Sequence, residues 1–157
     1  ELARDHAFAR RIVNSGRLSV PSHLTTSPLN TPDDPADAFA GTMAPGAPCA
    51  DAPIRLPDSR EGWLMQALGG DFTLLVFGAK LPDGALGGLP VPLRVVTISD
   101  DLPGALADPS GAATARYDAR PGTLYLIRPD QHVAARSRGF DRDWLDAALS
   151  RALGRQN

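Results

Sequence analysis

The sequence has little of what several classes of protein require. Its single cysteine, Cys49, excludes an internal disulfide framework and is typical of a reducing compartment such as the cytoplasm. No apolar run approaches the roughly 18 residues that a membrane-spanning helix needs, and no signal-peptide pattern opens the chain. The net charge of −2 gives no basic excess that would favour nucleic acid or an anionic membrane. We therefore expect a cytoplasmic protein that binds neither.

The common catalytic motifs are missing as well. The sequence has no P-loop, no Gly-x-Ser-x-Gly nucleophile elbow and no Gly-x-Gly-x-x-Gly between a strand and a helix. His6, His23 and His132 are scattered without metal-ligand spacing. The acidic pairs Asp33-Asp34 and Asp100-Asp101 stand in loop-like sequence, where helix capping is the simpler interpretation. We assign no catalytic, cofactor-binding or metal-ligating residue to this chain.

Proline and glycine, in contrast, are abundant at 15 residues each, and the prolines crowd the first third of the chain. Those between Arg17 and Pro57 exclude long helices and central strands. The apolar residues among them favour an ordered, extended segment that wraps a neighbouring surface. A flexible linker is the alternative, but it would be richer in glycine and serine.

These shifts in composition predict three parts. Residues 1–16, with helix-forming composition over Glu1–Ser15, are interpreted as the tail helix of a preceding domain. An ordinary surface helix of this domain is an equally open interpretation. Residues 17–45 form the proline-rich extended connection, and residues 46–157 form the domain proper.

The clearest structural pattern is Thr123–Arg136. Thr123–Ile127 has the composition of a strand, and Arg128 to Gln131 has turn chemistry. His132–Arg136 alternates, with Val133 and Ala135 on one face and His132, Ala134 and Arg136 on the other. The stretch predicts an antiparallel hairpin, in which Arg128 and Arg136 pair with Asp130 or with carbonyl groups.

A helix follows the hairpin. Asp141 is its expected N-cap, Phe140 and Leu145 form a hydrophobic staple, and Gly154 stands where a glycine would end it. One apolar stripe at helical spacing is expected to pack on the sheet, and in it Trp144 and Leu149 are expected to be buried. The stripe comprises Trp144, Leu145, Ala148, Leu149, Ala152 and Leu153.

The middle of the chain supplies the other elements of the predicted fold. Phe72–Phe77 and Leu93–Ile98 are apolar runs of strand length, expected to be core strands. Smaller elements are a strand in Asp51–Leu56, a helix opened by a capping box of Asp58 and Glu61 and ending at Gly69-Gly70, and short helical pieces around Leu102–Ala107 and Ala112–Tyr117. The stretch Lys80–Pro92 is rich in glycine and proline and is expected to hold at most a short helix near Asp83–Leu89. Two buried strands with a crossover, followed by a strand–strand–helix unit, predict a thioredoxin-like α/β fold, a mixed sheet with flanking helices.

Redox catalysis by such a fold requires a low-pKa cysteine at a helix N-terminus just after the first core strand. That place holds Gly78-Ala79-Lys80-Leu81, without a thiol. Cys49 lies in the proline-rich part and has no resolving partner, so we interpret it as a small apolar filler or a bystander. The redox cysteines of the fold are absent.

Four stretches in order resemble the C-terminal region of FAD-dependent aromatic-ring monooxygenases, the class of phenol hydroxylase, 3-(3-hydroxyphenyl)propionate hydroxylase and the polyketide aromatic hydroxylases. They are SPLNTPD (27–33), FAGTMAPGAPCADAPI (39–54), GGDFTLLVFG (69–78) and TLYLIRPDQHVAAR (123–136). The resemblance covers residues 17–154. In that family this region is a thioredoxin-like domain that has lost its redox cysteines.

The resemblance implies a parent enzyme that uses FAD, NAD(P)H and O₂ to hydroxylate an aromatic ring. The dinucleotide motif, flavin motif and substrate pocket of the family have no counterpart in this chain. The chain would then be a non-catalytic structural or assembly domain, the tail helix of residues 1–16 would belong to the catalytic domain, and the partners would be the preceding FAD-binding catalytic domain and, in a homo-oligomer, a second copy. The alternative is a stand-alone, redox-inactive thioredoxin-like module that binds a partner protein.

Overall fold

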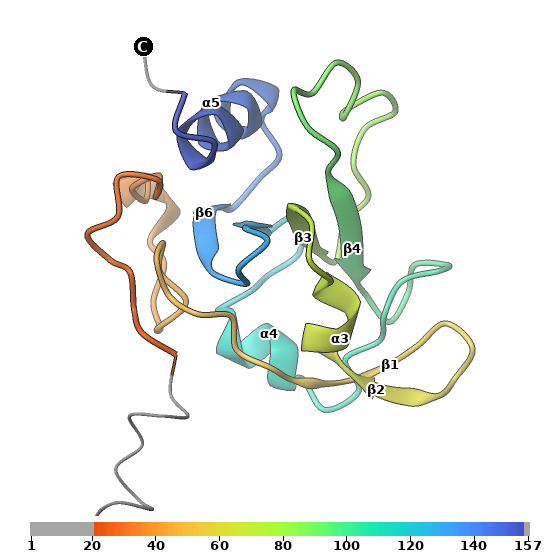
Figure 1. The fold of residues 1–157 in the computed structure, drawn as a ribbon. Helices are drawn as coiled ribbons and strands as arrows, with labels where there is room; N and C mark the ends of the chain where they lie inside the picture. The colour runs from red at the N-terminus through yellow and green to blue at the C-terminus, as the bar shows by residue number, and fades with distance from the viewer. Residues whose placement is uncertain (1–20, 156–157) are drawn as a thin grey trace, which may run out of the picture.

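The computed structural model describes residues 21–155. The helix predicted within Glu1–Ser15, and His6, lie outside them. The centre is a four-stranded sheet in the order β4-β3-β5-β6 (Figure 1). It comprises β3 (Thr73–Phe77), β4 (Arg94–Ile98), β5 (Leu124–Ile127) and β6 (Val133–Ser137). β3 and β4 are parallel and the other two pairings antiparallel, so the predicted thioredoxin-like mixed sheet with flanking helices is confirmed.

Both faces of this sheet are covered, because successive side chains of a strand point to opposite faces. On one face, Leu75, Phe77 and Tyr125 join a cluster with α3 (Leu64–Leu68) and α4 (Ala112–Arg116). On the other, Leu74 and Leu126 pack with α5 (Arg142–Ala152). β3 is buried along its whole length, which confirms the expectation of a strand covered on both sides.

The crossover between β3 and β4 has no helix. Residues 78–93 form turns and loops, so the stretch expected to hold at most a short helix near Asp83–Leu89 holds none. The loop still covers the sheet, because Ala79, Leu81, Leu86, Leu89 and Val91 pack against the cluster that α5 completes. Pro82 and four glycines in the loop explain why these apolar side chains reach the sheet without a helix.

The hairpin predicted at 123–136 is present, but its second strand does not alternate as expected. Leu126 pairs with Ala135 and Ile127 with Val133, so Ala134 is an extra residue in a β-bulge. Val133 joins the cluster of α3 and α4, whereas both Ala134 and Ala135 join that of α5. The prediction that Val133 and Ala135 share a face is therefore wrong.

The capping box predicted at Asp58 and Glu61 is also wrong. Glu61–Trp63 is strand β2, which pairs with β1 (Pro53–Arg55) in a separate two-stranded sheet. The helix α3 starts only at Leu64, and Asp51 accepts a hydrogen bond from the Met65 amide at 3.0 Å. Gly62 and Trp63 are poor helix formers, and the pairing with β1 satisfies their backbone instead.

Three further expectations meet mixed outcomes. β4 lies at an edge of the sheet with Arg94 and Val95 exposed, so it is less buried than predicted. Residues 102–107 form turns and bridges, not a helix, whereas α4 confirms the helix predicted at Ala112–Tyr117. In α5, Asp141 caps the helix as predicted and Leu149 is buried, but Trp144 is only half-buried.

The described part of the proline-rich segment lies alongside β6 (Figure 1), and we call residues 21–49 the arm. Its end pairs with the hairpin in antiparallel fashion: the Gly46 amide donates to the Val133 carbonyl at 2.7 Å and the Val133 amide to the Ala47 carbonyl at 2.9 Å. The Thr31 amide donates to the carbonyl of the bulge residue Ala134 at 2.8 Å. The arm thus protects an otherwise open edge of the sheet.

Candidate functional site

The position at which thioredoxin-like enzymes carry their thiols lies at the carboxyl end of β3. Here Phe77 is followed by Gly78, whose φ of 60° is left-handed and whose added Cβ would lie 3.1 Å from the Pro121 Cα. An open hollow of about 240 Å³ adjoins it, lined by residues that include Ser99, Asp101 and Arg120. No sulfur, and no histidine, lines the hollow. The described residues therefore place no thiol and no redox pair at this position.

The only thiol lies elsewhere, on the arm. The Cys49 amide donates to the Gln131 carbonyl at 2.8 Å, which places the residue beside the hairpin turn. Burial raises the pKa of the Cys49 thiol to about 12, with the Tyr117 hydroxyl opposing that shift. A thiol with so high a pKa is protonated at neutral pH and is a poor nucleophile. This agrees with its interpretation as an apolar filler.

The most highly organised polar cluster joins the arm to β6 and the residue after it. The Arg136 guanidinium donates to both carboxylate oxygens of Asp33, at 2.9 and 2.6 Å, and its side chain is only 4% exposed. Arg138 donates to the Asp118 carboxylate at 2.6 Å and to the Asp37 carbonyl at 3.1 Å. The partners of Arg136 were predicted to be Asp130 or carbonyl groups, so that prediction is wrong.

An aromatic ring completes this cluster, which we call the arm clamp (Asp33, Asp37, Phe39, Asp118, Arg136 and Arg138). The guanidinium carbons of Arg136 and Arg138 lie 4.3 and 3.7 Å from the Phe39 ring centroid, within cation–π range. The ring also meets Tyr125 edge-on, at a centroid distance of 6.1 Å. A backbone hydrogen bond from Ala40, supported by Arg138, lowers the pKa of Asp118. The clamp holds the arm, and each of its two guanidinium groups is paired with a carboxylate of the chain.

The hairpin turn carries a second polar group. Arg128 donates to Asp130 at 2.5 and 3.1 Å, as predicted, and its hydrogen bonds lower the pKa of the Asp130 carboxyl. The His132 ring lies between the carbonyl oxygens of Asp130 and Ser22. Gln131 adopts a left-handed φ of 61°, the strained position of the turn.

In each acidic pair considered as a candidate in the sequence, one side chain, Asp34 or Asp100, accepts a hydrogen bond from a backbone amide. Asp34 caps the 3-10 helix η1 (Pro35–Asp37), where its Oδ1 accepts from the Ala36 amide at 2.9 Å. Asp100 accepts from the Asp108 amide, and Asp108 in turn accepts from two amides at the start of α4. Within residues 21–155, no group of three or more His, Cys, Asp or Glu side chains is arranged to hold a metal ion. None of the helices in that range is long and apolar enough to cross a membrane.

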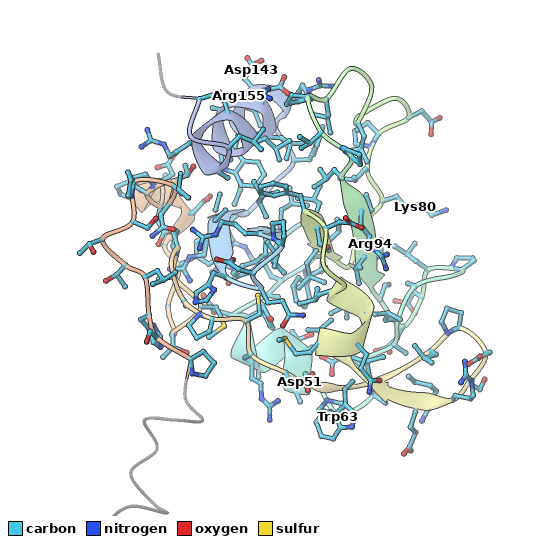
Figure 2. All side chains as sticks on the ribbon, viewed as in Figure 1. Asp51, Trp63, Lys80, Arg94, Asp143 and Arg155 are labelled. Atoms are coloured by element: carbon cyan, nitrogen blue, oxygen red, sulfur yellow. The ribbon has the colours of Figure 1, made fainter. Side chains whose placement is uncertain are left out.

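Among residues 21–155, one large aromatic side chain is exposed. Trp63 is 50% exposed and points away from the body of the domain (Figure 2). It borders an open hollow of about 410 Å³ with Pro53 and Pro109. Single exposed apolar residues are common on protein surfaces, so this one alone defines no binding site.

Comparisons with solved structures agree with the fold. The flavin-dependent monooxygenase PieE, solved with FAD and substrate, is 22% identical, with a TM-score of 0.65 over 99% of this chain and 31% of its own. Aklavinone-11 hydroxylase, solved with FAD and aklavinone, is 22% identical, with a TM-score of 0.65 over 82% of this chain and 26% of its own. The rebeccamycin biosynthetic enzyme RebC is 24% identical, with a TM-score of 0.61 over 96% and 26%. The chain therefore spans less than a third of the length of each of these relatives.

These features define a class first: a thioredoxin-like α/β domain with one cysteine and no redox pair. The family of aromatic-ring hydroxylase C-terminal domains matches residues 42–156, which is more than half of the chain, and the chain belongs to that family. The resemblance seen in the sequence is thereby confirmed. A search of curated protein sequences found no match.

The arm clamp was not found from the sequence. Its pairs join residues 103 and 20 positions apart, and nothing in the local pattern links Asp33 to Arg136 or Asp118 to Arg138. The signal available was indirect: Asp33, Asp37 and Phe39 stand in a proline-rich segment where a flexible linker would carry glycine and serine.

Proposed function

We propose that this chain is the C-terminal structural domain of an FAD-dependent monooxygenase that hydroxylates an aromatic substrate with NAD(P)H and O₂. The observation that carries the proposal is the match of residues 42–156 to the aromatic-ring hydroxylase C-terminal family. The solved relatives named above are two flavin enzymes and a biosynthetic enzyme, each about three to four times as long as this chain. The hydroxylation itself would be carried out by the part of the polypeptide that precedes this domain.

The residues described here do not fit FAD. Dinucleotide sites place a pyrophosphate on the N-terminus of a helix that follows a strand through a glycine-rich turn. After β3 the chain forms a loop over residues 78–93 with no helix, and β4 leads into turns. In our proposal FAD and NAD(P)H bind the preceding domain, and this domain contributes packing and assembly contacts.

The domain division follows from the same proposal. Residues 1–16 would be the tail of the catalytic domain, residues 17–45 the connection, and residues 46–157 the thioredoxin-like domain, in a cytoplasmic enzyme that can form homo-oligomers. The close packing of the arm on β6 favours the second candidate, a stand-alone interaction module. The arm is already bound to the sheet of this chain and needs no second domain to hold it in place. The family match favours the monooxygenase.

The test compares the complete parent protein with this chain alone. We expect the parent to purify with flavin absorbance and to oxidise NAD(P)H in an aromatic-dependent manner. The chain alone is expected to be colourless and inactive. A yellow chain that keeps its flavin through gel filtration would overturn the non-catalytic assignment. A parent gene without a strand-linked Gly-x-Gly-x-x-Gly upstream would instead favour the stand-alone module.

A further inference from the structure

The His132 ring is held between two backbone carbonyl oxygens. Its Nδ1 lies 3.1 Å from the Asp130 carbonyl oxygen, and its Nε2 lies 3.0 Å from the carbonyl oxygen of Ser22 on the arm. Carbonyl oxygens accept hydrogen bonds and never donate, so each contact needs a proton on the ring nitrogen. A neutral imidazole has one N–H group, whereas an imidazolium has two. Only the imidazolium satisfies both contacts.

The surroundings decide which contact a neutral ring would lose. The Asp130 carboxylate Oδ1 lies 3.5 Å from Nδ1 and also accepts the His132 amide at 3.2 Å. A carbonyl and a carboxylate oxygen therefore both face Nδ1 and favour a proton there. The neutral ring then turns the Nε2 lone pair toward the Ser22 carbonyl oxygen, and that contact becomes repulsive.

The other titratable groups near the ring do not replace it. Asp130 is already paired with the Arg128 guanidinium at 2.5 Å. Burial raises the pKa of Cys49, on the arm segment that pairs with the turn, so its thiol remains neutral. His23, the residue after Ser22, is exposed and makes no hydrogen bond within residues 21–155. The charge that changes at this contact is that of His132.

The contact holds the start of the arm. Residues 21–26 are all exposed, and the next attachments are the Leu24 amide to the Gly46 carbonyl and the Asn30 side-chain amide to the Leu24 carbonyl, both at 2.7 Å. We propose that His132 is a proton-operated tether: the imidazolium holds Ser22 on the hairpin, and deprotonation releases it. The rest of the arm stays on β6, because the arm clamp and the pairing of residues 46–49 do not involve the ring. The inference rests on these contacts and is independent of the proposed function.

The test is a nuclear magnetic resonance titration of the labelled chain between pH 5.5 and 8.5, the range in which histidines usually change charge. It follows the ring nitrogens of His132 and the backbone amide of residue 23, which reports on a hydrogen bond to the Ser22 carbonyl. We expect both signals to change with one midpoint. A coupling across the hydrogen bond, from Nε2 to the Ser22 carbonyl carbon, should be present at pH 5.5 and lost at pH 8.5.

Two variants separate the tether from other causes. His23→Gln removes the adjacent imidazole, and the amide of residue 23 should still follow His132. In His132→Gln the same amide should no longer titrate. An amide that stays constant in the wild-type chain, or that titrates unchanged in His132→Gln, would overturn the proposal. The wild-type measurement decides the question even if a variant folds poorly.

Discussion

At the scale of single residues, the arm clamp shows how charge is used inside this domain. Arg136 is 5% exposed, and a guanidinium so deeply buried is tolerated only when it is paired. Its bidentate contact with Asp33 neutralises the charge, and the Phe39 ring lies against its planar face. Removing one partner of the pair is expected to destabilise the fold mainly because the other charge would remain buried without a counterion.

The first prediction removes that counterion. Asp33→Asn should lower the free energy of unfolding by about 1–3 kcal/mol. The loss should fall short of that for a fully buried pair, because the Asp33 carboxylate is 32% exposed and water screens it. Urea denaturation measures the change. The matched control is Asp58→Asn, whose partner Arg60 is 75% exposed and whose pair should contribute nothing measurable. Equal losses in the two variants would contradict the role assigned to burial.

The second prediction concerns the thiol. A pKa raised to about 12 keeps Cys49 protonated at pH 8, where an unperturbed thiol is partly ionised. Iodoacetamide should therefore label the folded chain far more slowly than the chain in denaturant at the same pH, as followed by mass spectrometry. Comparable rates in the two states would show an accessible thiolate, and the apolar-filler interpretation would be wrong.

At the scale of elements, the predictions that succeeded depended on local signals. Asp141 accepts from the amides of Asp143 and Trp144, and Gly154 has a left-handed φ of 71°, so both ends of α5 were encoded within a few residues. β3 and β5 were equally evident, because a short, continuous apolar run favours a buried strand.

The predictions that failed depended on partners far away in sequence. Asp58 and Glu61 have the spacing of a capping box, but residues 61–63 pair with β1, and Asp51 serves the start of α3. The bulge at Ala134 places Ala135 on the α5 face, and strict alternation could not have revealed that extra residue. Tertiary pairing overrode local preference in each case.

The third prediction tests the packing of α5. Leu149 is fully buried against the sheet, so Leu149→Ala should cost about 2–5 kcal/mol through lost burial and a residual cavity. Trp144 is half-buried, and Trp144→Ala should cost clearly less. Thermal melting of the two variants measures the order. A larger loss for Trp144 would mean that the helix is rotated about its axis relative to the structure described here.

At the scale of the whole molecule, the arm and the sheet form one packed unit over the described residues. Met43 is 7% exposed and belongs to the same cluster as Leu75 and Tyr125. The Gly46 amide, the bulge carbonyl of Ala134 and the guanidinium groups of Arg136 and Arg138 all find partners across the boundary between arm and domain. Composition suggested that the folded domain starts near Gly46, whereas these contacts make the preceding residues part of its support.

The last prediction follows from that support. A chain shortened to residues 46–157 loses Met43 from the core, which alone typically costs about 2–5 kcal/mol, and leaves Arg136 without Asp33. Compared with a chain of residues 21–157, it should melt roughly 10 °C lower or more, because about 1 kcal/mol shifts the midpoint by roughly 4–8 °C in a small domain. Limited proteolysis should accordingly spare the arm of the longer chain. If the two chains melt together and the arm is digested first, the arm is a detachable connection, and the folded domain begins near Gly46 as its composition suggested.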